Sequence, residues 1–290
     1  APKLAMAAID NLRGAVEFGE VTHLVVASCT GFVAPGIDQI IAARLGLPEV
    51  ERTLVGFMGC YAAVAALRVA HHIVRSEPRA RVLVVTVELS SLHLQQDADL
   101  ESLLAMLQFG DGAAAALVTA EPAGFGIEHL FSLALPESAE LISWQVGDHG
   151  FAMHLSGEVP GRIGASLGGE AVRETILNGW DVQSVDWWAV HAGGRSILDA
   201  VERGLELSQG ALAASRNVLE QFGNMSSATL MFVLAELAKR PGPGRGVALA
   251  FGPGLAAYSS VPAPKSKWIR RPLTPRPMPR CWATWRGSTP

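Results

Sequence analysis

Three residues of this sequence, Cys60, His191 and Asn224, are of types that could together carry out thiol chemistry. Cys60 lies between a glycine-containing turn and an apolar run that predicts a buried helix. A cysteine at a helix N-terminus lies at the positive end of the helix dipole, which lowers its pKa and favours the nucleophilic thiolate. The alternative is a packed core cysteine, because free cysteines are commonly buried.

His191 and Asn224 each have a structural and a chemical interpretation. His191 follows an apolar stretch, residues 187–190, that predicts a strand. It could act as a general base or charge partner for Cys60, or it could only form a hydrogen bond at the end of the strand. Asn224 could cap a helix, or its amide could donate a hydrogen bond to an oxyanion.

The composition excludes several classes of protein. Of the 290 residues 49% are apolar, which suffices for a large core, and no apolar run is long enough to span a bilayer. The three cysteines form no disulfide framework or CxxC pattern, and no HExxH motif or signal peptide is recognised. We therefore expect no metal and a reduced, cytoplasmic setting.

Charge is unevenly distributed along the chain. Residues 261–290 hold seven of the 23 Lys and Arg and none of the 27 Asp and Glu. The rest of the chain has 16 basic against 27 acidic side chains, and an acidic body argues against nucleic-acid binding.

The hydrophobic pattern predicts alternating strands and helices that would position these residues. The predicted strands cover residues 21–27, 53–55, 81–87, 113–118, 185–190 and 247–251. The predicted helices cover residues 5–18, 37–45, 60–75, 100–107, 171–177, 196–204 and 225–239. Residues 121–165 predict a mixture of strands and loops.

A repeat relates the two halves of the chain at an offset of 164 residues. Strand 21–27 matches residues 185–191, Gly59-Cys60 matches Gly223-Asn224, and the strand after Arg81 matches the one after Arg245. Three elements in one order at one offset predict a duplicated α/β unit with parallel sheets. Ligands bind beyond the carboxyl ends of such strands, so the candidate residues, with Cys29, are expected to converge on one face.

Five motifs together resemble a known family. They are Gly59-Cys60-Tyr61-Ala62, Phe109-Gly110-Asp111-Gly112, His191-Ala192-Gly193-Gly194, Gly223-Asn224-Met225-Ser226-Ser227 and Phe251-Gly252-Pro253-Gly254. Over residues 3–256 the chain resembles type III polyketide synthases of the chalcone and stilbene synthase family. The resemblance implies a thiolase-like α/β fold, in which two related halves pack as a five-layered core. It places the first half at 1–120, the second at 121–256 and an irregular tail at 257–290.

The resemblance implies an acyltransferase that extends a CoA-linked starter with malonyl-CoA units by decarboxylative condensation. The expected protein is a cytoplasmic homodimer without a cofactor. Cys60 would carry the acyl group as a thioester, while His191 and Asn224 would stabilise the enolate formed on decarboxylation. Phe109 resembles a gatekeeping aromatic whose apolar face disfavours the malonyl carboxylate.

Other positions are implied to line the substrate cavity. Where plant members carry a second phenylalanine and two threonines, this chain has Met153, His93 and Cys29, which is typical of bacterial members. The cavity floor is implied to be Gly252, Pro253 and Gly254. Starter, number of extensions and cyclisation route stay open.

Both ends depart from the family pattern. The family's opening elements have no counterpart before Ala1, so we expect an N-terminally truncated chain. Residues 261–290 hold seven prolines, a composition that predicts no further core strand. Two alternatives remain: a catalytically impaired fragment that serves only as a dimerisation partner, and a non-decarboxylating thiolase relative with Cys29 or Cys281 as second catalytic cysteine.

Overall fold

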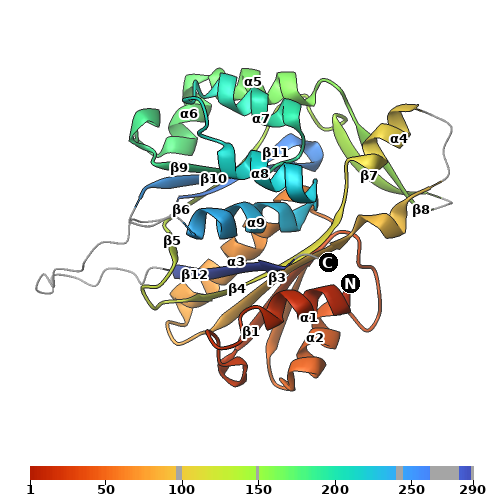
Figure 1. Ribbon diagram of the computed structural model, residues 1–290, viewed down its shortest axis with the longest axis vertical. Helices are drawn as coiled ribbons and strands as arrows, with labels where there is room; N and C mark the ends of the chain where they lie inside the picture. Colours follow the sequence, from red (N-terminus) through yellow and green to blue (C-terminus); the bar gives the residue numbers. More distant parts are fainter. Residues whose placement is uncertain (96–99, 148–149, 240–243, 262–280, 289–290) are drawn as a thin grey trace, which may run out of the picture.

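The computed structural model describes residues 1–290 except 96–99, 148–149, 240–243, 262–280 and 289–290, and Figure 1 shows its elements. The described helices are α1 Pro2–Asp10, α2 Ile37–Leu45, α3 Ala62–Ser76, α4 Leu100–Leu107, α5 Val159–Gly168, α6 Glu170–Leu177, α7 Arg195–Gly204, α8 Ala213–Phe222 and α9 Ser227–Ala238. The described strands are β1 His23–Ser28, β2 Glu51–Gly56, β3 Val82–Leu89, β4 Asp111–Thr119, β5 Phe125–Ile127, β6 His129–Ala134, β7 Ile142–Gly147, β8 Gly150–Leu155, β9 Trp187–Val190, β10 Gly246–Gly252, β11 Ala256–Val261 and β12 Cys281–Ser288.

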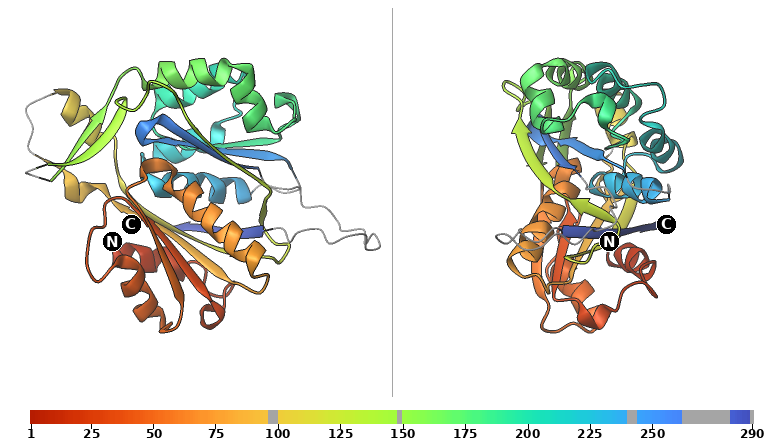
Figure 2. Two further views of the ribbon diagram at one scale, coloured as in Figure 1. Left: turned by 180° about the vertical axis from the view of Figure 1, so that it is seen from behind. Right: turned by 90° about the vertical axis from the view of Figure 1, so that its left-hand side faces the viewer.

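Two stacked sheets alternate with three layers of helices (Figures 1 and 2). α1 and α2 cover the outer face of the first sheet, α3 and α9 lie between the sheets, and α5, α6 and α7 cover the second sheet. In β3, Val82 and Val84 pack in the cluster around α3 and α9, whereas Leu83 and Val85 pack under α1 and α2. This alternation follows the two-residue period of a strand. The five-layered α/β architecture predicted from the sequence is confirmed.

The prediction of parallel sheets is wrong in part, because both sheets are mixed. The first has the order β2-β1-β3-β4-β12-β5, in which β1 runs parallel to β2 and β3, while β4 runs antiparallel to β3. Leu89 at the end of β3 pairs with Asp111 at the start of β4. The chain between them, which includes α4, returns to the same end of the sheet instead of crossing it, so β4 must run back.

The second sheet repeats this topology and confirms the duplication. Its order is β6-β11-β10-β9, with β9 parallel to β10 and with β11 antiparallel to both β10 and β6. β9 and β10 begin at residues 187 and 246, each 164 residues after the start of its counterpart, β1 at 23 and β3 at 82. β12 lies beside β4 as β6 lies beside β11.

The prediction of an irregular tail is wrong for two segments. β11 directly follows the turn at Pro253 and Gly254 and joins the second sheet, and β12 pairs with β4 and β5 in the first. Neither segment contains a proline. The averaged composition concealed them, because the prolines lie before and after β12. The rest of the predicted tail lies outside the described residues.

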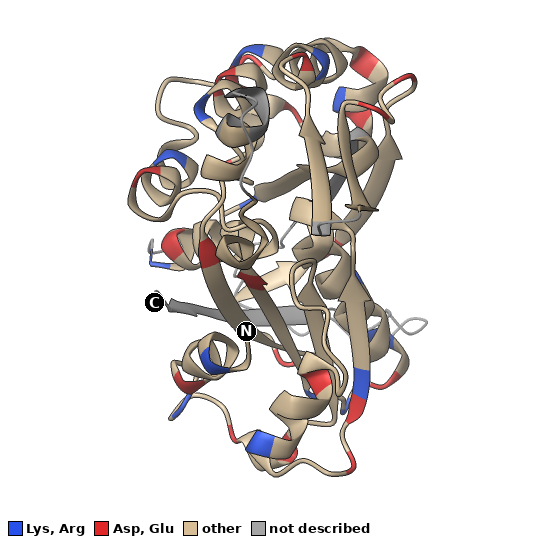
Figure 3. Cartoon of the chain, turned by 90° about the vertical axis from the view of Figure 1, so that its right-hand side faces the viewer, with Lys and Arg blue, Asp and Glu red and all other residues tan. Residues whose placement is uncertain are grey.

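Charged residues lie mostly on outer helices and loops, and the long strands are largely uncharged (Figure 3). No helix within the described part of the chain is long and apolar enough to cross a membrane. Burial of an ionisable group between sheets and helices is unfavourable unless the group forms hydrogen bonds. Glu88 on β3 is such a buried group.

Candidate active site

A tight turn between β2 and α3 presents Cys60. The turn contains the short 3-10 helix Gly59–Tyr61, so the α-helix begins at Ala62, two residues after the cysteine. Gly59 has φ +67°, and a Cβ there would clash with the ring of Pro253, so no other residue fits without strain. Its N–H donates to the Cys29 Sγ at 2.9 Å. The backbone that carries the nucleophile is therefore fixed from two sides.

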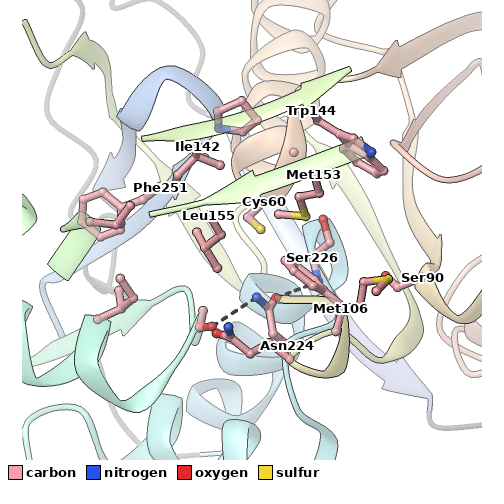
Figure 4. A pocket seen from close by; sticks show the side chains of 18 of the residues that line it. Cys60, Ser90, Met106, Ile142, Trp144, Met153, Leu155, Asn224, Ser226 and Phe251 are labelled. Carbon is pink, nitrogen blue, oxygen red and sulfur yellow. Dashed lines mark hydrogen bonds between the residues drawn. The ribbon is translucent and has the colours of Figure 1, made fainter. Parts of the chain in front are cut away.

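Cys60, His191 and Asn224 line one cavity of about 420 Å³, as the sequence predicted (Figure 4). Residues from both halves surround it, including Met106, Phe109, Ile142, Trp144, Phe151, Met153, Leu155, Ile163, Ile197, Ser226 and Phe251. Among the described lining residues none is Asp, Glu, Lys or Arg. A cavity of this kind suits a largely apolar, uncharged chain.

Hydrogen bonds fix the orientation of the Asn224 amide. Its Oδ1 accepts from the Ser226 backbone N–H at 2.9 Å, and its Nδ2 donates to the Gly193 carbonyl at 3.2 Å (Figure 4). The amide therefore turns its NH₂ group to the side of Gly193 and Cys60, where it lowers the pKa of the thiol. The amide hydrogen that faces Cys60 could be donated instead to an oxyanion formed beside the sulfur.

His191 presents an imidazole without partners to the cavity. Its backbone N–H donates to the Leu249 carbonyl at 2.8 Å, while the side chain is only 2% exposed and neither ring nitrogen has a hydrogen-bond partner within the described chain. Burial lowers the pKa of His191 to about 4, so the free ring is neutral. Two buried, unsatisfied nitrogens beside a nucleophile are expected where a substrate supplies the missing partner.

The expectation that the helix dipole lowers the pKa of Cys60 is not met. The pKa of the thiol is raised to about 12, chiefly by burial and also by the nearby Glu88, against the lowering effect of hydrogen bonds from Ser226 and Asn224. A lone charge on either Cys60 or His191 is thus costly. A thiolate and an imidazolium formed together would stabilise each other, which favours joint ionisation of the two residues over ionisation of either one alone.

Sequence analysis missed Glu88, a fully buried carboxyl group beneath the cavity. It accepts hydrogen bonds from the Cys29 N–H at 3.0 Å, the Thr30 N–H at 3.2 Å, the Thr30 hydroxyl at 2.8 Å and the Ser227 hydroxyl. Burial raises the pKa of Glu88 to about 7 despite these donors. A glutamate inside an apolar strand was the available signal, because such a residue is almost never fully buried unless it has partners.

Phe109 lies directly beside Asn224. The two residues form an isolated parallel bridge, and the Gly110 N–H donates to the Asn224 carbonyl at 2.8 Å. Phe109 also lines the cavity, so an apolar ring stands next to the amide donor. Phe109 therefore contacts the cavity as expected, and its role as a gatekeeping aromatic remains a prediction.

Four of the other predicted lining residues contact the cavity and two do not. Met153, His93, Gly252 and Pro253 line it, whereas Gly254 does not. Cys29 is fully buried and lies under the turn at Gly59, and its neighbour Thr30 lines the cavity instead.

Sequence analysis also missed an aromatic group on the hairpin β7–β8. Trp144 and Phe151 contact each other with ring centroids 5.2 Å apart, and His93 lies 4.8 Å from Phe151. All three line the cavity.

No three metal-ligating side chains group together in the described chain, and the uncharged lining offers no counter-charges for a bound ion.

Comparison with known proteins bears on this site. The chain matches the N-terminal domain of chalcone and stilbene synthases over residues 3–122 and the C-terminal domain over residues 129–261. It is 36% identical over 248 residues to the alpha-pyrone synthesis polyketide synthase-like Pks18 of Mycobacterium tuberculosis and of Mycobacterium bovis. The match covers 81% of this chain and 63% of those proteins, so the chain spans less than two thirds of their length.

Solved structures share the fold. The C-terminal type III polyketide synthase domain of Steely1, a type I/III hybrid from Dictyostelium, has a TM-score of 0.83 and 28% identity, covering 92% of this chain and 77% of that one. PKS-I from the brown alga Ectocarpus siliculosus has a TM-score of 0.82 and 31% identity, covering 91% and 73%.

Fold and site together define an α/β protein of thiolase-like fold with a cysteine, a histidine and an asparagine around one cavity. The chain belongs to the chalcone and stilbene synthase family, that is, to the type III polyketide synthases.

Proposed function

We propose that the chain is an acyltransferase that condenses malonyl-CoA units, with loss of carbon dioxide, onto a CoA-linked starter held on Cys60. The observation that carries this proposal is the convergence of Cys60, His191 and Asn224 on one uncharged cavity in a member of this family. Neither a metal nor a further cofactor is needed for these steps.

Loading of the starter uses Cys60 and His191. The imidazole takes the thiol proton, the thiolate attacks the thioester carbonyl of the acyl-CoA, and CoA departs with a proton from the imidazolium. Burial disfavours a lone charge on either residue. The Cys60 thiolate therefore exists only while His191 is protonated.

Decarboxylation of malonyl-CoA uses His191 and Asn224. Loss of carbon dioxide leaves the electron pair on the thioester as an enolate, whose oxygen gains negative charge. The amide hydrogen of Asn224 that faces Cys60 and an N–H of His191 are the available donors to that oxygen. Phe109, beside Asn224, offers the departing carboxylate an apolar surface that favours uncharged carbon dioxide.

The enolate carbon then attacks the thioester carbon on Cys60, and the carbon–sulfur bond to Cys60 breaks. The chain, longer by two carbons, is now a CoA thioester and is transferred back to Cys60 for the next extension. The name of the mycobacterial relative favours an α-pyrone among the products that the family allows, over a resorcinol or chalcone type. We further propose a cytoplasmic location, because the nucleophile must remain a free thiol.

We also propose that the protein is a homodimer. The Phe32 ring lies 5.6 Å from Phe57 and 5.4 Å from Phe151, which lines the cavity. Phe32 is 66% exposed, and the adjacent Val33 is exposed as well. Exposed apolar groups that continue a cavity wall favour a protein partner at that position.

No observation favours the thiolase alternative: Cys29 lies buried with its pKa raised and does not contact the cavity.

Two variants separate the steps. Cys60→Ala should form no acyl adduct by intact-protein mass spectrometry, yet should still release carbon dioxide from malonyl-CoA. Asn224→Ala should accept the acyl group but release carbon dioxide roughly a hundredfold more slowly. Asn217→Ala, on α8 away from the cavity, is the matched control. Normal decarboxylation by Asn224→Ala would contradict the mechanism, and a folded wild type without adduct or carbon dioxide would support the impaired-fragment alternative.

A further inference from the structure

A second histidine, His93, faces the same cavity as the catalytic residues and has no part in loading or decarboxylation. It lies at the end of the short 3-10 helix Ser90–His93, which follows β3. The backbone N–H and hydroxyl of Ser91 donate to the Asp111 carboxylate at 2.9 and 2.6 Å, which holds this helix against the start of β4. The imidazole is therefore carried by a fixed element.

The hydrogen bond of His93 defines its tautomer. Nε2 lies 2.8 Å from the Thr30 carbonyl oxygen, and a carbonyl can only accept. Nε2 must therefore carry the hydrogen, and in the neutral ring Nδ1 is left as a proton acceptor. No partner of Nδ1 is found in the described chain.

The surroundings of His93 hold this orientation. The ring packs 4.8 Å from Phe151 and edge-on to Trp144 at 6.3 Å, with an interplanar angle of 89°. Thr30 is fixed in turn, because its N–H and hydroxyl donate to Glu88 and its hydroxyl accepts from the Leu89 N–H at 2.8 Å. A proton acceptor held in this way needs no reorganisation when a substrate arrives.

Few groups in the cavity can accept a proton. Among the described lining residues, Cys60, His93 and His191 are the titratable ones. While a polyketide intermediate is attached to Cys60, the sulfur is a thioester, and His191 serves the thioester carbonyl. His93 is then the remaining base that faces the intermediate.

We propose that His93 is a further catalytic residue, which accepts the enol proton of the diketo intermediate during ring closure. This rests on the proposed function. The O–H bond of the enol breaks and its proton passes to Nδ1, while the enol oxygen forms a bond to the thioester carbon. The carbon–sulfur bond to Cys60 breaks, and the departing sulfur takes the proton back from His93. The product is a six-membered lactone, an α-pyrone, and no further reactant is consumed.

The test measures, by mass spectrometry, the ratio of lactone to open-chain acid among products of equal extension. An acyl-CoA starter and malonyl-CoA are the substrates, samples are quenched at neutral pH, and released carbon dioxide counts the extensions. His93→Gln retains an N–H for the Thr30 carbonyl but lacks a basic nitrogen, and His93→Ala leaves space for imidazole added to the buffer. The matched control is His154→Gln, an exposed residue on β8 that does not line the cavity.

General-base catalysis typically contributes at least a hundredfold, so His93→Gln should lower the ratio by about that factor. Imidazole should restore the ratio in His93→Ala, and His154→Gln should keep the wild-type ratio. A wild-type ratio in His93→Gln, or a loss in His93→Ala that imidazole leaves unchanged, overturns the role of His93 while the proposed function stands. A wild-type chain that releases no carbon dioxide overturns both.

Discussion

Replacement of Glu88 by glutamine should change how the stability of the protein depends on pH. Glutamine has nearly the same shape but stays neutral, whereas the buried glutamate ionises as the pH rises. The folded pKa of Glu88 is raised from 4.5 to about 7. Its stabilising contribution is therefore fully present below pH 4.5 and is lost as the pH rises through about 7.

The expected size follows from the shift in the pKa of Glu88. One pKa unit corresponds to about 1.4 kcal/mol, so ionisation of the buried group lowers the unfolding free energy of the wild type by about 3 kcal/mol between pH 4.5 and 8. For a chain of this size that corresponds to about 6 °C in melting temperature. The variant itself loses acceptor capacity for Thr30 and Ser227, which costs about 1–3 kcal/mol at every pH.

Two buried histidines change the stability of the protein with pH in the opposite direction to Glu88. Burial lowers the pKa values of His71 and His191 to about 4, so their contribution is present above pH 6.5 and is lost as the pH falls toward 4. They act equally in wild type and variant, so the difference between the two proteins at each pH isolates Glu88.

Thermal unfolding followed by circular dichroism at half-unit steps from pH 4.5 to 8 provides the measurement. The difference in melting temperature between Glu88→Gln and the wild type should increase by about 6 °C in favour of the variant from pH 4.5 to pH 8. Glu77→Gln, at an exposed position after α3, is the matched control and should run parallel to the wild type. Parallel curves for Glu88→Gln would refute the reasoning, because they would mean that the carboxyl group does not change its charge on burial.

Two further predictions concern the thiol and the surface. His191→Ala should slow alkylation of Cys60 by iodoacetamide at pH 7.5 about tenfold or more, because the Cys60 thiolate loses its imidazolium partner. Peptide mass spectrometry distinguishes alkylation of Cys60 from that of Cys29. An unchanged rate would contradict the pairing of Cys60 with His191. Phe32→Asp should shift the sedimentation coefficient from dimer to monomer, whereas Val146→Asp, at another exposed apolar position, should not; a monomeric wild type would exclude the proposed dimer.

The sequence predicted that Cys60, His191 and Asn224 meet at one cavity, because each follows a strand that ends at a glycine-containing turn or begins a helix. Gly59 and Gly223 mark the turns before the two central helices, and the repeat offset pairs them. Glu88 was missed because the apolar run around it masks one polar residue. Its partners come from the turn after β1 and from the start of α9, which are distant in sequence. The pKa of Cys60 depends on burial by both halves, a tertiary effect that no local pattern contains.

Elements outside the repeat were harder to predict. Strand β7 alternates apolar and polar residues from Ile142 to Val146, which indicates a strand but not the cavity that Trp144 lines, and β8 around Phe151 lacks such alternation. The boundaries of the two halves and the roles of the site residues remain predictions.

The duplication explains why the site needs both halves. α3 and α9 lie between the two sheets, and the turns before them, with Cys60 in one and Asn224 in the other, meet at one cavity. In the proposed mechanism each turn supplies what the other lacks, a nucleophile or an oxyanion donor. The Gly110 N–H ties Asn224 to the first half, and Glu88 ties β1, β3 and α9 together through Thr30 and Ser227. A change in any of these contacts should therefore alter loading and decarboxylation together, unlike the loss of Cys60 or Asn224, each of which should affect one step.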